Sequence, residues 1–124
     1  MLRIIVGGQM EKQRIADRVQ ELGGERVSVQ IKSDIEAALL IQQGEADYYF
    51  GCCATGGGGA LAGAIAILGY DRCAYASMPS VAPEKDKIEQ FAAEGKKAFG
   101  FTESHLDAAV NLLMEVLLSR ESDG

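Results

Sequence analysis

Short apolar segments alternate along this chain with longer segments whose apolar residues recur at helical spacing. The apolar segments are residues 2–6, 26–31, 47–51, 72–76 and 97–101, and the helical segments are residues 10–22, 33–43, 60–68, 83–94 and 102–118. A strand followed by a helix and a further strand normally places the two strands parallel, with helices on both faces of the sheet. The alternation therefore predicts an α/β protein, with a three-layer, doubly wound, five-stranded parallel sheet in a single Rossmann-like domain over residues 1–124.

The composition of each apolar segment predicts its place in the sheet. Interior strands of a parallel sheet are buried on both faces, so they are apolar almost throughout. The first, third and fourth segments fit that description, whereas the second alternates between polar and apolar residues and the fifth contains Lys97 and Gly100. We therefore predict that the second and fifth strands are the edges, which gives the flavodoxin-like order 2-1-3-4-5.

A glycine-rich loop follows the third apolar segment. Its sequence is Gly51-Cys52-Cys53-Ala54-Thr55-Gly56-Gly57-Gly58-Gly59. Glycine loses more backbone freedom on folding than any other residue, so four in a row need a reason beyond a simple turn. Glycines before a helix leave backbone N–H groups that an anion can approach closely. We predict that this loop binds a small anionic ligand. The alternative is that its glycines only allow the helix to pack closely on the sheet.

A second glycine-containing loop, Gly7-Gly8-Gln9, should meet the first one. Ligands of doubly wound sheets bind at the carboxyl ends of the strands, where the winding reverses. The expected order places that point between the first and third strands, which these two loops follow. The predicted phosphate or carboxylate therefore contacts residues of both loops, namely Gly7, Gly8, Gln9, Thr55, Gly56, Gly57, Gly58 and Gly59. Its affinity for the site should be modest unless Arg72 or a second subunit supplies a cation.

Two adjacent cysteines, Cys52 and Cys53, precede the glycines. A helix N-terminus stabilises a thiolate and lowers the pKa of a cysteine placed there. Because alternate side chains of a strand point to opposite faces, only one of the two can face the ligand, and Cys53 is the candidate. The alternative is that both are small buried hydrophobic residues. No metal site is expected, since adjacent cysteines lack the Cys-x-x-Cys spacing of zinc ligands.

Neither common nucleotide motif is present in the glycine-rich loop. The Lys and Ser/Thr of a Walker A motif do not follow Gly56-Gly57, and a dinucleotide fingerprint is expected after a first strand rather than a third. No cofactor is therefore expected.

Charge and cysteine content bound the partners and the compartment. The formal net charge is −6, and no basic cluster is larger than Lys96-Lys97, which disfavours nucleic acid and anionic membranes. The longest apolar run, residues 60–68, is too short to span a bilayer. Three cysteines, two of them adjacent, do not make a disulfide framework. We expect a cytoplasmic protein without direct membrane insertion.

The helix from Ala60 to Leu68 is apolar around its whole circumference. A helix without a polar face must be covered on all sides, either by neighbouring helices or by a second subunit. Small residues such as Gly59, Gly63 and Ala64 permit close approach of another helix. We therefore expect a homo-oligomer that associates through this helix.

Over nearly its whole length the chain resembles the bacterial YhfU-like family, which has no established activity. The matching features are Asp47-Tyr48-Tyr49, Cys53-Ala54-Thr55-Gly56-Gly57-Gly58, the run through Gly69-Tyr70, and Ala93-Glu94-Gly95-Lys96-Lys97-Ala98-Phe99-Gly100. Genes for such proteins tend to lie beside a membrane transporter and pyridoxal-phosphate enzymes. The resemblance thus implies a place in a small-molecule pathway.

The segment Cys53-x-Thr55-Gly56-x-Gly58 is also similar to the loop of the RpiB/LacAB-type sugar-phosphate isomerases. In those enzymes the cysteine is the base that moves a proton between adjacent carbons, and the loop amides hold the developing enediolate. This resemblance implies that Cys53 is the base and that Gly56 to Gly58 form the oxyanion cradle. It departs from the isomerase pattern at Gly7-Gly8-Gln9, where those enzymes have an Asp-His pair.

Three functions are therefore open at this point. The first is a module that binds a small anionic metabolite, tied to a transport or metabolic pathway. The second is a sugar-phosphate-type isomerase that uses Cys53. The third is a structural subunit of a protein complex.

Overall fold

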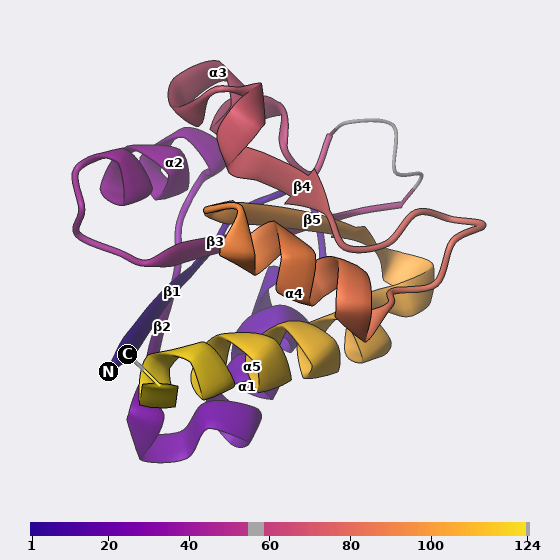
Figure 1. Ribbon diagram of the computed structural model, residues 1–124. Helices are drawn as coiled ribbons and strands as arrows, with labels where there is room; N and C mark the ends of the chain where they lie inside the picture. Colours follow the sequence, from indigo (N-terminus) through magenta and orange to yellow (C-terminus); the bar gives the residue numbers. More distant parts are fainter. Residues whose placement is uncertain (55–58, 124) are drawn as a thin grey trace.

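A computed structural model describes residues 1–54 and 59–123 (Figure 1). Its strands are β1 (Leu2–Val6), β2 (Val27–Ile31), β3 (Tyr48–Cys53), β4 (Cys73–Tyr75) and β5 (Ala98–Thr102). Its helices are α1 (Lys12–Gly23), α2 (Asp34–Gln42), α3 (Ala62–Leu68), α4 (Lys85–Ala93) and α5 (Leu106–Asp123). Each strand is followed by a helix, as the alternation predicts.

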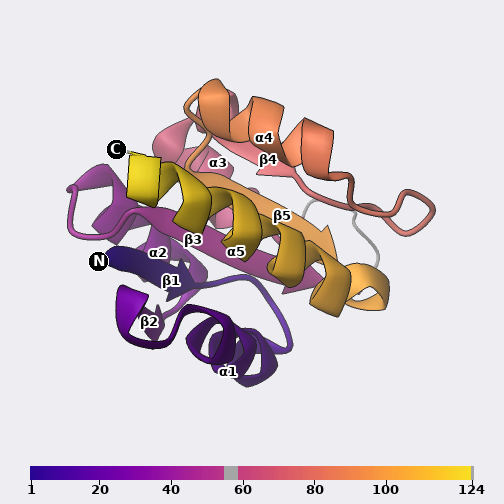
Figure 2. The same cartoon turned by 60° about the horizontal axis from the view of Figure 1, so that its bottom comes forward.

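The five described strands form one parallel sheet, covered by helices on both faces. Helices α1, α4 and α5 lie on one face and α2 and α3 on the other, as Figures 1 and 2 show. On the first face, Phe50 packs edge-on against Phe99 and Phe101. On the second face, Tyr49 and Leu61 belong to a separate buried cluster. The predicted three-layer parallel α/β class is confirmed.

The predicted strand order 2-1-3-4-5 is wrong in its last two strands, because the observed order is β2-β1-β3-β5-β4. Lys97, which suggested an edge, lies just before β5, with its ammonium 5.1 Å from the centre of the Tyr48 ring. Gly100 is buried, and a Cβ there would come within 2.8 Å of Leu61 Cγ. Its small size therefore admits the Leu61 side chain onto an interior strand. The edge is instead β4, which is apolar but has only three residues.

Residues at the two ends of helix α2 explain where it begins and ends. The Ser33 hydroxyl accepts a hydrogen bond from the Glu36 N–H at 3.2 Å and donates to Glu36 Oε1 at 3.1 Å. This N-cap satisfies a backbone N–H that the first turn would otherwise leave unpaired. The helix ends before Gly44, whose φ of 77° is one that glycine adopts readily. Within the described part of the chain, no helix combines the length and apolar character that crossing a bilayer requires.

Helix α3 begins at Ala62, two residues later than expected, after a turn at Gly59 and Ala60. Helix α2 of the same chain packs against it, with Gly63 lying close to Asp34. Part of the expected cover therefore comes from a neighbouring helix. Ala62 and Ala66 are exposed, and Ile65, Ile67 and Leu68 are partly buried. A second subunit on this remaining face stays a prediction.

Candidate functional site

The carboxyl ends of β1, β3 and β5 bring the predicted site residues together. We use the name loop cluster for Gly7–Gln9, Cys52–Ala54 and Gly59–Ala60, together with Ser77 and Thr102. A Cβ on Gly8 would lie 2.6 Å from the backbone nitrogen of Cys52, and a Cβ on Gly59 would lie 2.6 Å from Gln9 Oε1. The two glycine-containing loops are thus in contact, as the sequence predicts. Thr55, Gly56, Gly57 and Gly58 lie outside the described residues.

The backbone amides of the first loop bond to the protein itself. The Gly7 N–H donates to the Phe50 carbonyl at 2.9 Å, and the Gln9 N–H donates to the Cys52 carbonyl at 3.1 Å. The Gly8 N–H donates to the Tyr49 hydroxyl at 2.9 Å. Gly7 to Gln9 therefore form a closely fitted wall of the site, and any amide donors to an anion must come from the second loop.

Tyr49 joins the two loops. Its buried hydroxyl accepts from the Gly8 N–H and donates to the Ala60 carbonyl at 2.9 Å. Gly7 and Gly51 make room for its ring, since a Cβ would come within 2.5 Å of Cε2 at Gly7 and 2.9 Å of Cε1 at Gly51. Burial raises the pKa of Tyr49, so the phenol keeps the proton that it donates. Sequence reasoning missed this residue, although a polar hydroxyl in an apolar strand was a signal that it needs a partner.

The two cysteines lie on opposite faces of β3. Cys52 belongs to the hydrophobic cluster that contains Phe50 and Phe101, and burial raises the pKa of its thiol to about 12. It is therefore a neutral core residue at physiological pH. Cys53 alternates with it and lies on the face covered by α3, where only 3% of its surface is exposed. The three cysteines are all described, and none of them is in a disulfide.

Two buried hydroxyl groups stand at the strand ends next to Cys53. Thr102 is paired with Cys53 in the register of β3 and β5, and it is fully buried. Its N–H donates to Ser77 Oγ at 3.3 Å, and its hydroxyl is hydrogen-bonded to that of Ser104 at 3.0 Å. Sequence reasoning missed Thr102 and Ser77. The signal was their position directly after apolar strand residues, where the carboxyl ends of parallel strands meet.

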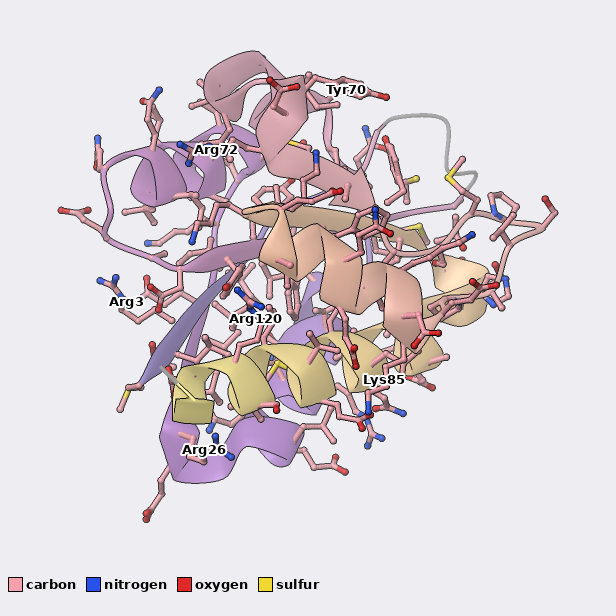
Figure 3. The ribbon with its side chains drawn as sticks, viewed as in Figure 1. Arg3, Arg26, Tyr70, Arg72, Lys85 and Arg120 are labelled. Carbon is pink, nitrogen blue, oxygen red and sulfur yellow. The ribbon has the colours of Figure 1, made fainter. Side chains whose placement is uncertain are left out.

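The charged groups that act on Cys52 near the loop cluster are of both signs. Beside the larger effect of burial, Glu11 and Glu103 raise the pKa of Cys52 and Arg14 lowers it. Arg14 is already paired with Glu11, at 3.2 Å. Glu11 also has a φ of 58°, a left-handed conformation that is uncommon outside glycine, immediately before α1. Arg72, which was considered as a cation for the ligand, lies at the amino end of β4, in a cavity that Arg3 also lines (Figure 3). Ligand binding at the loop cluster would therefore depend on neutral donors.

Comparisons with known proteins agree on the family and on the fold. Residues 2–117 match a family described as a protein of unknown function, DUF2620. An uncharacterized protein, YhfU, of Escherichia coli K12 is 34% identical over 117 residues, covering 94% of this chain and 99% of its own length. The YhfU protein of Shigella flexneri has the same identity and coverage.

A solved structure shares the fold. The ribose 5-phosphate isomerase RpiB of Thermotoga maritima superimposes with a TM-score of 0.67, over 95% of this chain and 86% of that one, at 16% sequence identity. The parallel sheet with helices on both sides is thus an arrangement that this isomerase also has.

Proposed function

Since the chain belongs to the DUF2620 family of unknown function, we infer its function from the loop cluster, and we propose that it binds a small phosphate- or carboxylate-bearing metabolite there. The proposal describes a cytoplasmic, homo-oligomeric binding module in a transport or metabolic pathway. The observation that carries it is the contact between the two glycine-containing loops, held together through the Tyr49 hydroxyl.

Neutral groups can supply such a site with donors. Backbone N–H groups in a glycine-rich loop bind phosphate and carboxylate groups without a basic side chain. The amides of Gly7 to Gln9 are already bonded, so the donors belong to residues 55–59 and to the nearby hydroxyls. Repulsion of an anion by the net charge of −6 is limited, because that charge is screened within about 10 Å at ordinary salt.

A titration with inorganic phosphate and ribose 5-phosphate, followed by isothermal calorimetry and amide NMR, tests this proposal. The Gly57→Val variant should lose binding, because its side chain projects from backbone that must approach the ligand. Ala108→Val is a matched control, since Ala108 is an exposed position of α5, away from the face of α3 that we expect a second subunit to cover. Binding by a folded Gly57→Val protein with unchanged affinity would show that the loop does not hold the ligand.

A second candidate function is aldose–ketose isomerisation of a sugar phosphate, and the position of Cys53 supports it. Cys53 ends β3 beside the buried Thr102, in a fold shared with an enzyme named as a ribose 5-phosphate isomerase. Acting as base, the Cys53 sulfur would take the proton from the carbon next to the carbonyl. An enediolate forms, the proton held by the thiol exchanges with water, and the thiol returns a proton to the neighbouring carbon while a hydroxyl proton moves between the two oxygens. No oxidant or cofactor is consumed.

Proton exchange separates this second function from simple binding. Incubation with ribose 5-phosphate in D2O should place deuterium on the sugar carbon, and Cys53→Ala should abolish that exchange. Cys73→Ala is the control, because Cys73 lies in β4 and is also a buried thiol. Ligand binding without deuterium exchange in the wild-type protein would exclude isomerisation of this substrate and leave the binding proposal standing.

A further inference from the structure

A cavity of about 340 Å³ lies along the outer edge of β4, away from the loop cluster. Its walls come from Leu61 and Ile65 on one side of the sheet and from Phe91 of α4 on the other. None of the residues of the loop cluster lines it. The volume is at the lower end of the range of about 300–1,000 Å³ that is usual for small-molecule sites.

The interior of this β4-edge cavity is apolar and aromatic. Tyr75 and Phe91 are partly buried, and Leu61 is fully buried. Tyr70 stands at the mouth with 73% of its surface exposed, beside α3 in Figure 3. Exposed aromatic rings next to an apolar hollow mark a surface that binds apolar groups.

The free edge of β4 gives the cavity hydrogen-bonding groups. Within the described residues β4 pairs only with β5. The Arg72 carbonyl accepts from Lys97 N–H, and Ala76 N–H donates to the Gly100 carbonyl, each at 2.7 Å. Backbone groups of alternate residues point to the same side of a strand, so those of Cys73 and Tyr75 point away from β5. The Cys73 N–H already donates to the Tyr70 carbonyl. Within the described residues, an occupant of the cavity therefore meets the Cys73 carbonyl and the Tyr75 backbone groups, which no neighbouring strand uses.

Two opposite charges stand at the rim, and each is positioned by one hydrogen bond. Gln90 Nε2 donates to Glu94 Oε2 at 3.1 Å, and Lys96 Nζ donates to the Asp71 carbonyl at 2.8 Å. Among the described residues neither Glu94 nor Lys96 forms an ion pair. The Glu94 carboxylate thus keeps an acceptor oxygen and the Lys96 ammonium keeps two donors.

We propose that the β4-edge cavity binds a free α-amino acid with an aromatic or large apolar side chain. The side chain enters the hollow between Ile65 and Phe91, the carboxylate pairs with Lys96 and the ammonium pairs with Glu94. A zwitterion with an apolar substituent matches the pair of opposite rim charges and the apolar interior together. This site is independent of the function proposed for the loop cluster.

The probe for a first experiment is L-phenylalanine, compared with two analogues that each lack one charge. Amide NMR should show shifts at residues 65, 73–75 and 91 that saturate with L-phenylalanine. The dissociation constants of 3-phenylpropionate, without the ammonium, and 2-phenylethylamine, without the carboxylate, should be higher by about threefold to tenfold. Equal affinity for all three compounds would overturn the proposal, since an apolar hollow without zwitterion recognition would explain it.

Rim variants then assign each charge. Glu94→Gln should weaken L-phenylalanine by about threefold to tenfold and leave 3-phenylpropionate unchanged, and Lys96→Gln should weaken both of those ligands. Glu89→Gln is the matched control, because Glu89 lies on α4, the helix that ends just before Glu94, and outside the cavity. The absence of shifts up to about 10 mM ligand would overturn the proposal. So would signals of residues 73–75 that respond only to protein concentration, because the edge would then be an interface between copies.

Discussion

Replacing Tyr49 with phenylalanine removes one oxygen atom and separates the two glycine-containing loops. The Gly8 N–H loses its acceptor and the Ala60 carbonyl loses its donor, and both residues are buried. An unsatisfied buried polar group costs about 1–3 kcal/mol. For two such groups we expect Tyr49→Phe to lower the free energy of unfolding by about 2–4 kcal/mol, the lower part of the combined range, because the loops can relax toward water.

Urea denaturation measures this loss, and hydrogen exchange locates it. The amide of Gly8 should exchange faster in Tyr49→Phe than expected from the drop in global stability alone. Tyr75→Phe is the matched control, because within the described residues the Tyr75 hydroxyl forms no hydrogen bond, so its removal should cost less than about 0.5 kcal/mol. Equal losses in the two variants would refute the role of Tyr49 as the link between the loops.

Two further predictions concern the buried thiol and the exposed face of α3. The folded pKa of Cys52, raised to about 12 by burial, lies above the unfolded value of about 8.5, so the folded state keeps a proton that the unfolded state has lost. Stability should therefore fall as pH rises above about 8.5, by up to about 1.4 kcal/mol per pH unit, and urea denaturation should show a shallower fall in Cys52→Ala. An identical slope in both proteins would contradict this reasoning. If α3 joins two subunits, Ala66→Glu should shift sedimentation to the monomer, whereas Ala108→Glu, on the exposed side of α5, should not. A wild-type monomer at micromolar concentration would exclude the oligomer.

The sequence was sufficient for the class of fold because that depends on local periodicity. Alternating polar residues correctly placed β2 at an edge. The order of β4 and β5 was not accessible in the same way, since it depends on long-range packing of Leu61 over Gly100. When the Leu61 contact is not known, Gly100 and Lys97 favour an edge position for this strand. With only three residues, β4 has a length that fits an edge strand.

The contact between the two loops could be predicted from the places of their glycines, but the reason for each glycine could not. Gly7 and Gly51 accommodate the Tyr49 ring, and Gly8 combines a φ of 79° with close approach to the Cys52 nitrogen. A side chain at these positions disturbs the packing of β1 against β3 whether or not a ligand exists. A substitution at Gly8 therefore measures folding. If a ligand binds as we propose, Gly57 is the more informative position, because the amides of the first loop are already bonded within the protein.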